Sequence, residues 1–349
     1  MAERTRNDER RRKTLRDVAA RAGVSAVTVS RALRRPEMVS TDLRKRVQLA
    51  VDELAYIPNQ LASALASHRT DRIGVVVPSL TNGVFGDYLR ALHDMLLPEG
   101  FQVLVLNSGY VPGKEERAIA TMLGQHPEAI IVSGVDQTRQ ARRMLDEAGI
   151  PVIQTMEMTD DPIDIVIGLN QEDAGYAATR HLIDLGHRHI GQMAVPLDSR
   201  ALKRRHGYRR AIAEAGLELM ETSLDAPSTF AYGAELFEPM LTRWPKMTGI
   251  YCGNDNLALG ALFAAQRRGL KVPDDLSIVG FNDLEFSATA FPAITTVATP
   301  RYEIGELAAK IVLEIVRGSG ERPAERTINL GFRMIRREST AAPRTRLLA

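Results

Sequence analysis

Apolar residues near the N-terminus recur with the spacing of two short helices. The first set is spaced i, i+3, i+4 and i+7, which places it on one helix face: Leu15, Val18, Ala19 and Ala22. Gly23 follows, and glycine tolerates the positive φ at which helices commonly end. Ser25 is then placed to cap a second helix, whose buried positions are Val29, Ala32 and Leu33. The pattern therefore predicts two helices joined by a tight turn.

The second of these helices keeps small and polar residues on its outward face. They are Ala26, Val27, Thr28, Ser30 and Arg31. Two helices across a glycine-containing turn, with such a face on the second, are typical of a DNA-binding helix-turn-helix. An ordinary helical hairpin is the alternative that this pattern alone leaves open.

A longer helix and a short one complete the N-terminal part of the chain. Residues 41–54 carry apolar side chains on one side of a helix that begins after a hydroxyl cap. Asn59 can cap a further helix over residues 60–67, which is too short to be stable alone and should form only against a partner or DNA. We therefore expect a helix-turn-helix domain at 14–58 and a hinge helix with its linker at 59–71.

From residue 73 onward, short β-rich apolar runs alternate with helical segments. The expected strands are 73–77, 103–106, 129–132, 152–155, 165–167, 189–194, 249–252 and 277–281. The expected helices include 86–97, 114–125, 139–148, 174–185, 202–215 and 256–268. Many helices are followed by a terminating glycine, namely Gly100, Gly149, Gly186, Gly216 and Gly269. The alternation predicts parallel sheets covered on both faces, and the number of strands predicts two doubly wound lobes. Ligands of such folds bind at the carboxyl ends of strands.

Charge is distributed unevenly along the 349 residues. Residues 1–70 carry 15 Lys and Arg against 8 Asp and Glu, whereas the rest of the chain carries 30 against 35. A basic N-terminal part suits a polyanion such as DNA, because each neutralised phosphate releases counterions. Residues 1–13 lack an apolar period, so we expect a disordered basic tail that either contacts DNA weakly or aids solubility.

Composition argues against several function classes. The only cysteine, Cys252, lies among apolar residues, so neither a disulfide framework nor a cysteine nucleophile is expected. The chain shows neither a signal segment nor an apolar run of about 18 residues, which predicts a cytoplasmic protein that makes no membrane contact. The G-x-G-x-x-G of a dehydrogenase and the G-x-S-x-G of a hydrolase do not occur, and the histidines lack metal-site spacing. We therefore expect no enzyme activity, no cofactor and no metal.

A set of motifs then follows in a fixed order along the chain. They are Thr14–Ala19, Gly23–Ser25, Thr28–Arg31, Tyr56–Asn59, Leu185–Ile190, Gly253–Gly260 and Val272–Phe281. Together they resemble the lactose/galactose repressor (LacI–GalR) family of bacterial transcription regulators over residues 14 to about 337. Pro78–Asn82, Val84 with Phe85, and Leu270–Asp274 are similar to the gluconate-utilisation type of repressor within that family.

The resemblance implies a fold in two parts. The first would be an all-α helix-turn-helix domain with its hinge helix. The second would be an α/β core at residues 72–349, with two lobes and parallel sheets like those of a periplasmic binding protein. The first lobe would span about 72–186 and 300–327, and the second about 187–299 and 328–340. An exported sugar-binding protein is the alternative, and the missing signal segment and the basic N-terminal domain argue against it.

The resemblance also implies which residues contact double-stranded operator DNA. The second helix would lie in the major groove with Ala26 and Val27 as specificity positions, because such side chains can meet a thymine methyl. Arg31 can grip guanine, and Ser25 can contact phosphate. Leu65 of paired hinge helices would wedge into a minor-groove base step, or else it packs helix against helix. The expected DNA contacts are Leu15, Ser25, Ala26, Val27, Thr28, Ser30, Arg31, Asn59, Ala62 and Leu65.

A small-molecule effector site is implied between the lobes. Its expected residues are Ser79, Asn82, Phe85 and Asp173 from the first lobe, and Arg200, Arg204, Asn254, Asp255 and Asn282 from the second. Asp255 either binds the effector or caps the following helix. Arg200 and Arg204 share a helix face, and Lys203 and Arg205 add to the positive charge.

This charge points to a sugar acid. Several family members carry Asp where this chain has Asn282, and an amide there favours an anionic ligand. We expect gluconate or a ketogluconate. The extra arginines are alternatively solvated or paired across the lobes, and a neutral sugar or a nucleobase-type corepressor is the alternative effector.

The resemblance finally implies a regulated homodimer. Two copies would match a pseudo-palindromic operator, and the effector would shift the population of lobe arrangements and so change operator affinity. The C-terminal segment lacks heptads, so a coiled-coil tetramer is not expected.

Overall fold

The computed structural model describes residues 13–57, 69–195, 197–224, 226, 228–318 and 320–344. The chain divides into two compact units at residue 70. Residues 1–12 of the expected tail, residue 58 of the expected helix-turn-helix domain and residues 59–68 of the expected hinge lie outside the described residues. The predicted DNA contacts Asn59, Ala62 and Leu65 are among them.

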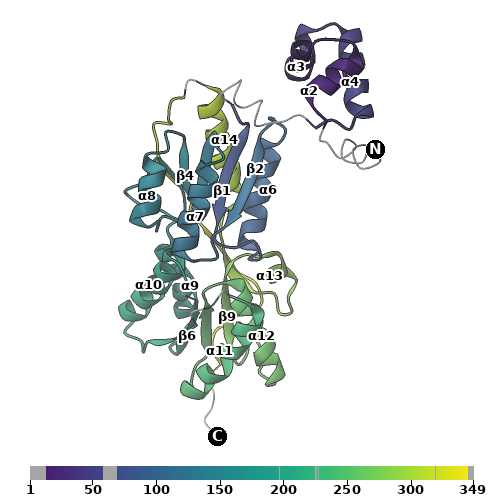
Figure 1. Cartoon of the computed structure of the whole chain (residues 1–349). Helices are drawn as coiled ribbons and strands as arrows, with labels where there is room; N and C mark the ends of the chain where they lie inside the picture. The colour runs from purple at the N-terminus through teal and green to yellow at the C-terminus, as the bar shows by residue number, and fades with distance from the viewer. Residues whose placement is uncertain are drawn as a thin grey trace, which may run out of the picture. The chain divides into compact units, whose positions relative to one another are not determined.

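The first unit is helical, as the periodicity predicted. Its elements are α2 (Leu15–Ala22), α3 (Ala26–Arg34), the 3₁₀ turn η1 (Pro36–Met38) and α4 (Thr41–Glu53) (Figure 1). Gly23 ends α2 at a φ of 65°, the left-handed conformation that glycine adopts at no steric cost. Ser25 caps α3 by accepting a hydrogen bond from the Thr28 amide over 3.1 Å. These local signals fix the turn between the two helices.

A small apolar core holds the three helices together. Val18, Val29 and Val47 are fully or almost fully buried, one from each helix. The Arg46 guanidinium of α4 also donates to the backbone carbonyl of Ala22 over 2.7 Å, which satisfies a carbonyl at the end of α2. Val29 and Ala32 of α3 belong to this core, so the opposite face of α3 points away from it.

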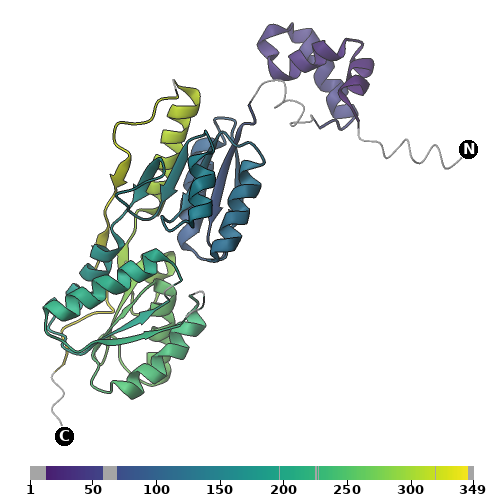
Figure 2. The ribbon, with the colours of Figure 1, turned by 60° about the vertical axis from the view of Figure 1, so that its left-hand side comes forward.

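The second unit contains two six-stranded sheets, one in each of two lobes (Figures 1 and 2). The first sheet has the order β11-β5-β4-β3-β1-β2, with β1 (Arg72–Val77), β2 (Gln102–Asn107), β3 (Ala129–Ser133), β4 (Val152–Thr155), β5 (Ile165–Gly168) and β11 (Thr327–Asn329). The second has the order β12-β10-β9-β8-β6-β7, with β6 (Ile190–Ala194), β7 (Met220–Ser223), β8 (Gly249–Cys252), β9 (Ser277–Asn282), β10 (Thr295–Ala298) and β12 (Arg333–Ile335). All strand pairs are parallel except β10 with β12.

Helices cover both faces of each sheet, as expected for a doubly wound fold. In the first lobe these are α6 (Val84–Leu96), α7 (Pro112–Leu123), α8 (Arg139–Asp146) and α14 (Arg301–Arg317). In the second lobe they are α9 (Gln171–Asp184), α10 (Ser199–Glu214), α11 (Phe230–Arg243), α12 (Asp255–Arg267) and α13 (Glu285–Thr289). Strand β1 shows the layering, because Ile73, Val75 and Val77 share a core with α6 and α14 whereas Val76 packs toward α7 and α8.

One expected lobe boundary is wrong. We expected the first lobe to continue to residue 186, but α9 packs against α10 and against β6, β8, β9 and β10 of the second sheet. The chain therefore crosses to the second lobe directly after β5. It crosses back between β10 and α14, and again between β11 and β12. Within the described part of the chain, no helix is long and apolar enough to cross a membrane.

Candidate functional site

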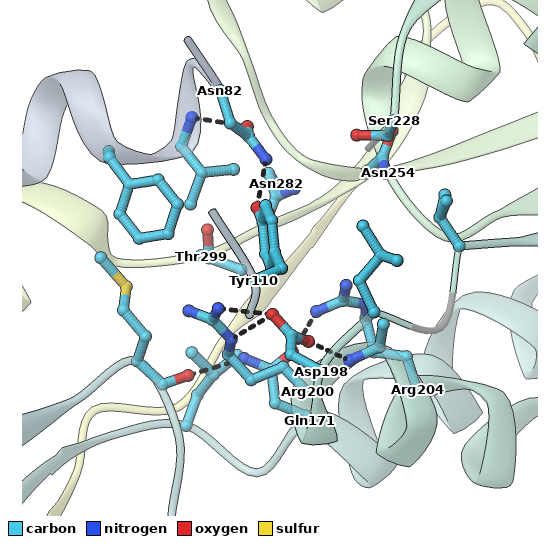
Figure 3. Close-up of a pocket in the computed structure, with 17 residues that line it drawn as sticks. Asn82, Tyr110, Gln171, Asp198, Arg200, Arg204, Ser228, Asn254, Asn282 and Thr299 are labelled. Atoms are coloured by element: carbon cyan, nitrogen blue, oxygen red, sulfur yellow. Dashed lines mark hydrogen bonds and ion pairs between the residues drawn. The ribbon is translucent and has the colours of Figure 1, made fainter. Parts of the chain in front are cut away.

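A cavity lies between the two lobes of the second unit (Figure 3). The space free of protein atoms is about 620 Å³, and part of it is open to solvent. Its walls include residues that follow the carboxyl ends of β1, β2, β6, β8, β9 and β10, where doubly wound folds bind ligands. The lining residues are Asn82, Val84, Phe85, Tyr110, Met156, Leu169, Gln171, Val195, Leu197, Asp198, Arg200, Ala201, Arg204, Ser228, Asn254, Asn282 and Thr299.

The structure brings most of the expected effector residues together here. They are Asn82, Phe85, Arg200, Arg204, Asn254 and Asn282. Three expected residues do not line the cavity: Ser79, Asp173 and Asp255. Arg200 and Arg204 both reach it from α10, as their helical spacing predicted.

Arg200 is held on several sides and joins the two lobes. Its Nε and Nη2 lie 3.1 and 2.5 Å from Oδ2 of Asp198, the residue that caps α10. Its Nη1 donates to the hydroxyl of Ser133, at the end of β3 in the first lobe, over 2.9 Å. The guanidinium also lies over the ring of Phe85, 5.7 Å from its centroid. Arg200 therefore positions the first turn of α10 and is already neutralised by a carboxylate.

Arg204 differs because its charge is not neutralised by an ion pair. Its Nη1 donates to the side-chain carbonyl of Gln171 over 2.8 Å, and its guanidinium stacks on Phe281, 4.7 Å from the ring centroid. Its Nε is buried and has no hydrogen-bond partner. No carboxylate pairs with Arg204 among the residues that the structure describes. A half-buried guanidinium with a buried, unpartnered N–H favours an added anion.

The neighbouring cations do not add to the cavity's charge, which corrects our expectation. Nζ of Lys203 lies 2.9 Å from Oε1 of Glu157, a buried carboxylate of the first lobe. Arg205 lies 2.5 Å from Glu221. Neither cation lines the cavity. Lys203 thus forms a salt bridge between the lobes, whereas Arg205 is paired within the second lobe. Among the described residues, the positive charge of the cavity comes from Arg200 and Arg204.

Amides and a phenol supply neutral polar groups. The Asn82 amide donates to the hydroxyl of Tyr110 over 3.3 Å. Burial raises the pKa of Tyr110 more than nearby Arg200 lowers it, so the phenol is neutral at physiological pH. Asn254 caps α12 by accepting from the Leu257 amide over 3.0 Å, and its amide nitrogen remains for a ligand. Asn282 takes a φ of 106°, which is strained for any residue but glycine and occurs preferentially at functional sites.

The three expected effector residues that do not line the cavity have structural roles instead. Asp255 is fully buried, where it accepts hydrogen bonds from the Leu284 amide and the Thr296 hydroxyl, each over 2.7 Å. Burial raises its pKa to about 6. It anchors the segment after Asn282 and does not contact the cavity. The Ser79 hydroxyl accepts a hydrogen bond from the backbone amide of Asn82 over 3.1 Å. Asp173 lies on the surface of the second lobe, where it forms an ion pair with Arg210 at 2.9 Å.

The outward face of α3 is the candidate DNA-binding surface. Val27 is 68% exposed, and Arg31 is exposed as well. Leu15 and Ala26 are partly buried and pack against the core of the first unit, so their side chains offer less surface than expected. The hydroxyl of Thr28 lies 2.8 Å from that of Ser25. The predicted DNA-binding roles of these residues remain predictions.

Both units match family models. The model described as bacterial regulatory proteins, lacI family, matches residues 14–59. The model described as periplasmic binding proteins and sugar binding domain of LacI family matches residues 70–337. The chain belongs to the LacI family.

Similar proteins include regulators and solved structures from that family. The HTH-type transcriptional regulator GntR of Pseudomonas aeruginosa is 39% identical over 342 residues, which are 96% of this chain and 99% of that protein. A LacI-family transcriptional regulator from Silicibacter pomeroyi has a TM-score of 0.88 at 35% identity, covering 95% of this chain and 100% of that one. The lac repressor dimer bound to operator and an anti-inducer has a TM-score of 0.80 at 28% identity, covering 95% and 100%.

LacI-family membership confirms the broad expectations. The chain is a DNA-binding transcriptional regulator with a helix-turn-helix and a sugar-binding domain, and it is not an enzyme. Regulators of this family bind operator DNA and a small-molecule effector and act as dimers.

Sequence reasoning missed several cavity residues, the most important being Asp198, Tyr110 and Gln171. A signal existed for Asp198, because an acidic residue directly before a helical segment is a common cap. Tyr110 follows Gly109 in a turn with a φ of 59°, and nothing in its local sequence indicates that it lines the cavity.

Proposed function

We propose that this chain is a repressor of sugar-acid catabolism genes and that gluconate or a ketogluconate, bound between the lobes, controls its operator affinity. The observation that carries the proposal is the half-buried side chain of Arg204, whose Nε is buried and has no hydrogen-bond partner. A ligand carboxylate would supply the missing partner through a charge-assisted hydrogen bond. A neutral sugar or a nucleobase would leave the positive charge unbalanced.

The rest of the cavity supports a polyhydroxylated ligand. The amides of Asn82, Asn254 and Asn282 each combine a donor and an acceptor, as sugar hydroxyls require. An amide at position 282 adds no negative charge against an acid. Similarity to regulators named GntR supports the same class of effector.

The proposed mechanism is a population shift between lobe arrangements. Effector would bind the arrangement in which both lobes contact it, and operator affinity would fall because the hinge segments no longer support each other on DNA. On the DNA, α3 of each of two copies would read one half of a pseudo-palindromic operator, with Val27 and Arg31 facing the bases. The regulator would act in the cytoplasm, where the operator is.

Isothermal titration calorimetry of the full chain tests the proposal. We expect gluconate and 2-ketogluconate to bind and galactose to bind much more weakly. Binding of the neutral sugar alone would overturn the sugar-acid assignment.

A further inference from the structure

Asp198 brings a negative charge into a cavity built for an anion. Its side chain is only 15% exposed and lies beside the guanidinium of Arg200, which also lines the cavity (Figure 3). Oδ1 accepts from the Ala201 amide over 2.9 Å, and Oδ2 accepts from Arg200. Burial raises the pKa of Asp198, but Arg200 and Arg204 lower it further, so its net pKa lies below the ordinary value and the group is charged at physiological pH.

The charge of the cavity can be counted from its lining. Among the lining residues that the structure describes, the ionisable groups are the cations Arg200 and Arg204, the anion Asp198, and the neutral phenol of Tyr110. These two positive charges and one negative charge leave a net charge of +1. A ligand with one negative charge balances it, whereas each further negative charge meets Asp198 without a cation left to offset it.

We propose that Asp198 is the charge-discriminating residue of the effector site, and that it selects a sugar acid with one negative charge over a phosphorylated sugar acid. The inference rests on the proposed function and goes beyond it, because it names which sugar acids are excluded and by which side chain. A phosphate monoester adds a charge of about −1.5 to −2 at pH 7, all of it repelled by Asp198.

The test is a charge series titrated into the full chain and into the Asp198→Asn variant. Asn caps helices as well as Asp, so α10 keeps its N-terminal hydrogen bond while the charge is lost. The ligands are sorbitol, gluconate and 6-phosphogluconate, which share a six-carbon polyol and differ in charge. Asp173→Asn is the matched control, because it removes an exposed carboxylate on the same lobe that does not line the cavity.

We expect Asp198→Asn to improve binding of 6-phosphogluconate relative to gluconate by about tenfold or more, and to change sorbitol binding least. Asp173→Asn should leave the ratio of 6-phosphogluconate affinity to gluconate affinity within about twofold of the unaltered chain, since exposed charges are well screened. A role of Asp198 in folding alone would change all three affinities together, and that result would overturn the proposal, as would an unchanged ratio. If the unaltered chain binds neither acid, the proposed function itself fails. Should Asp198→Asn not fold, Asp198→Ser keeps a capping hydroxyl and is judged by the same ratio.

Discussion

Arg200 of the second lobe donates a hydrogen bond to the Ser133 hydroxyl of the first lobe, over 2.9 Å. The same turn of α10 makes further contacts across the lobes. The Ser199 amide donates to Asp136 over 3.0 Å, and the Ser199 hydroxyl donates to Glu157 over 2.7 Å. One helix turn therefore lines the cavity and also fastens the lobes together. Ligand contact and lobe arrangement are coupled through the start of α10.

The Lys203–Glu157 ion pair should therefore influence effector affinity without touching the effector. Lys203→Met leaves a carboxylate that is 1% exposed without its cation, which disfavours the arrangement that binds ligand. We expect gluconate to bind about tenfold more weakly, corresponding to roughly 1.4 kcal/mol. Calorimetry measures the change. Arg180→Met, which breaks an exposed pair with Asp184, should change affinity by less than about twofold, and an equal loss in both variants would contradict the coupling.

Arg204 should provide most of the preference for an acid. Arg204→Gln keeps a side chain that can hydrogen-bond to Gln171 but removes the charge. We expect gluconate affinity to fall by about 10- to 100-fold, the usual contribution of a hydrogen bond to a charged group, and sorbitol affinity to change much less. The comparison of the two ligands by calorimetry is the measurement. A parallel loss for both ligands would mean that Arg204 acts by shaping the cavity.

Asp255 should make stability depend on pH. Burial raises its pKa to about 6, from an ordinary value of 3.8, so the folded chain holds a proton that the unfolded chain releases between these values. Burying the charged carboxylate lowers the free energy of unfolding. This loss is absent near pH 4 and complete above about pH 6, where it amounts to roughly 3 kcal/mol. We expect the wild-type chain to lose stability relative to Asp255→Asn as pH rises through this window.

Urea unfolding of both chains at several pH values between about 4 and 7 measures this difference. Asp255→Asn keeps an oxygen that can accept from the Leu284 amide, so the fold should survive. All other titrating groups are shared and cancel. A difference in unfolding free energy that does not vary with pH would show that the carboxyl titrates normally.

Arg31 should contribute to operator binding alone. Its side chain is exposed on α3 and no ion pair or hydrogen bond holds it within the described ranges. We expect Arg31→Gln to weaken operator binding by about 10- to 100-fold, as expected for loss of a base or phosphate contact, with effector affinity unchanged. Arg143→Gln, an exposed arginine of α8 paired with Glu147, is the control and should leave operator affinity intact. If both substitutions changed operator affinity equally, α3 would not be part of the DNA interface.

The sequence predicted features that depend on neighbouring residues. The turn at Gly23, the cap at Ser25 and the positions of the buried parallel strands follow from local spacing, and all are found. Contacts between distant segments were harder to predict. Nothing near Lys203 indicates that its partner is Glu157, and nothing near α9 assigns that helix to the second sheet.

In the candidate site, too, some residues could be predicted from local sequence and others depend on contacts between distant segments. Arg200, Arg204 and Asn254 could be predicted, because family motifs and helical spacing mark them. The capping role of Asp198 could also have been predicted, but the place of Asp198 and Tyr110 in the cavity could not, because it depends on which loops the two lobes bring together. The charge of the site was misjudged for the same reason, since counting cations along α10 ignores the distant carboxylates that pair with them.

The most direct test is operator binding with and without effector. Fluorescence anisotropy of the full chain on a duplex that it selects from a random library should show affinity falling at least about tenfold when gluconate is added, whereas sorbitol has no effect. Unchanged affinity at saturating gluconate would contradict the central claim that a sugar acid between the lobes controls DNA binding. A tighter complex would contradict the proposed direction of that control.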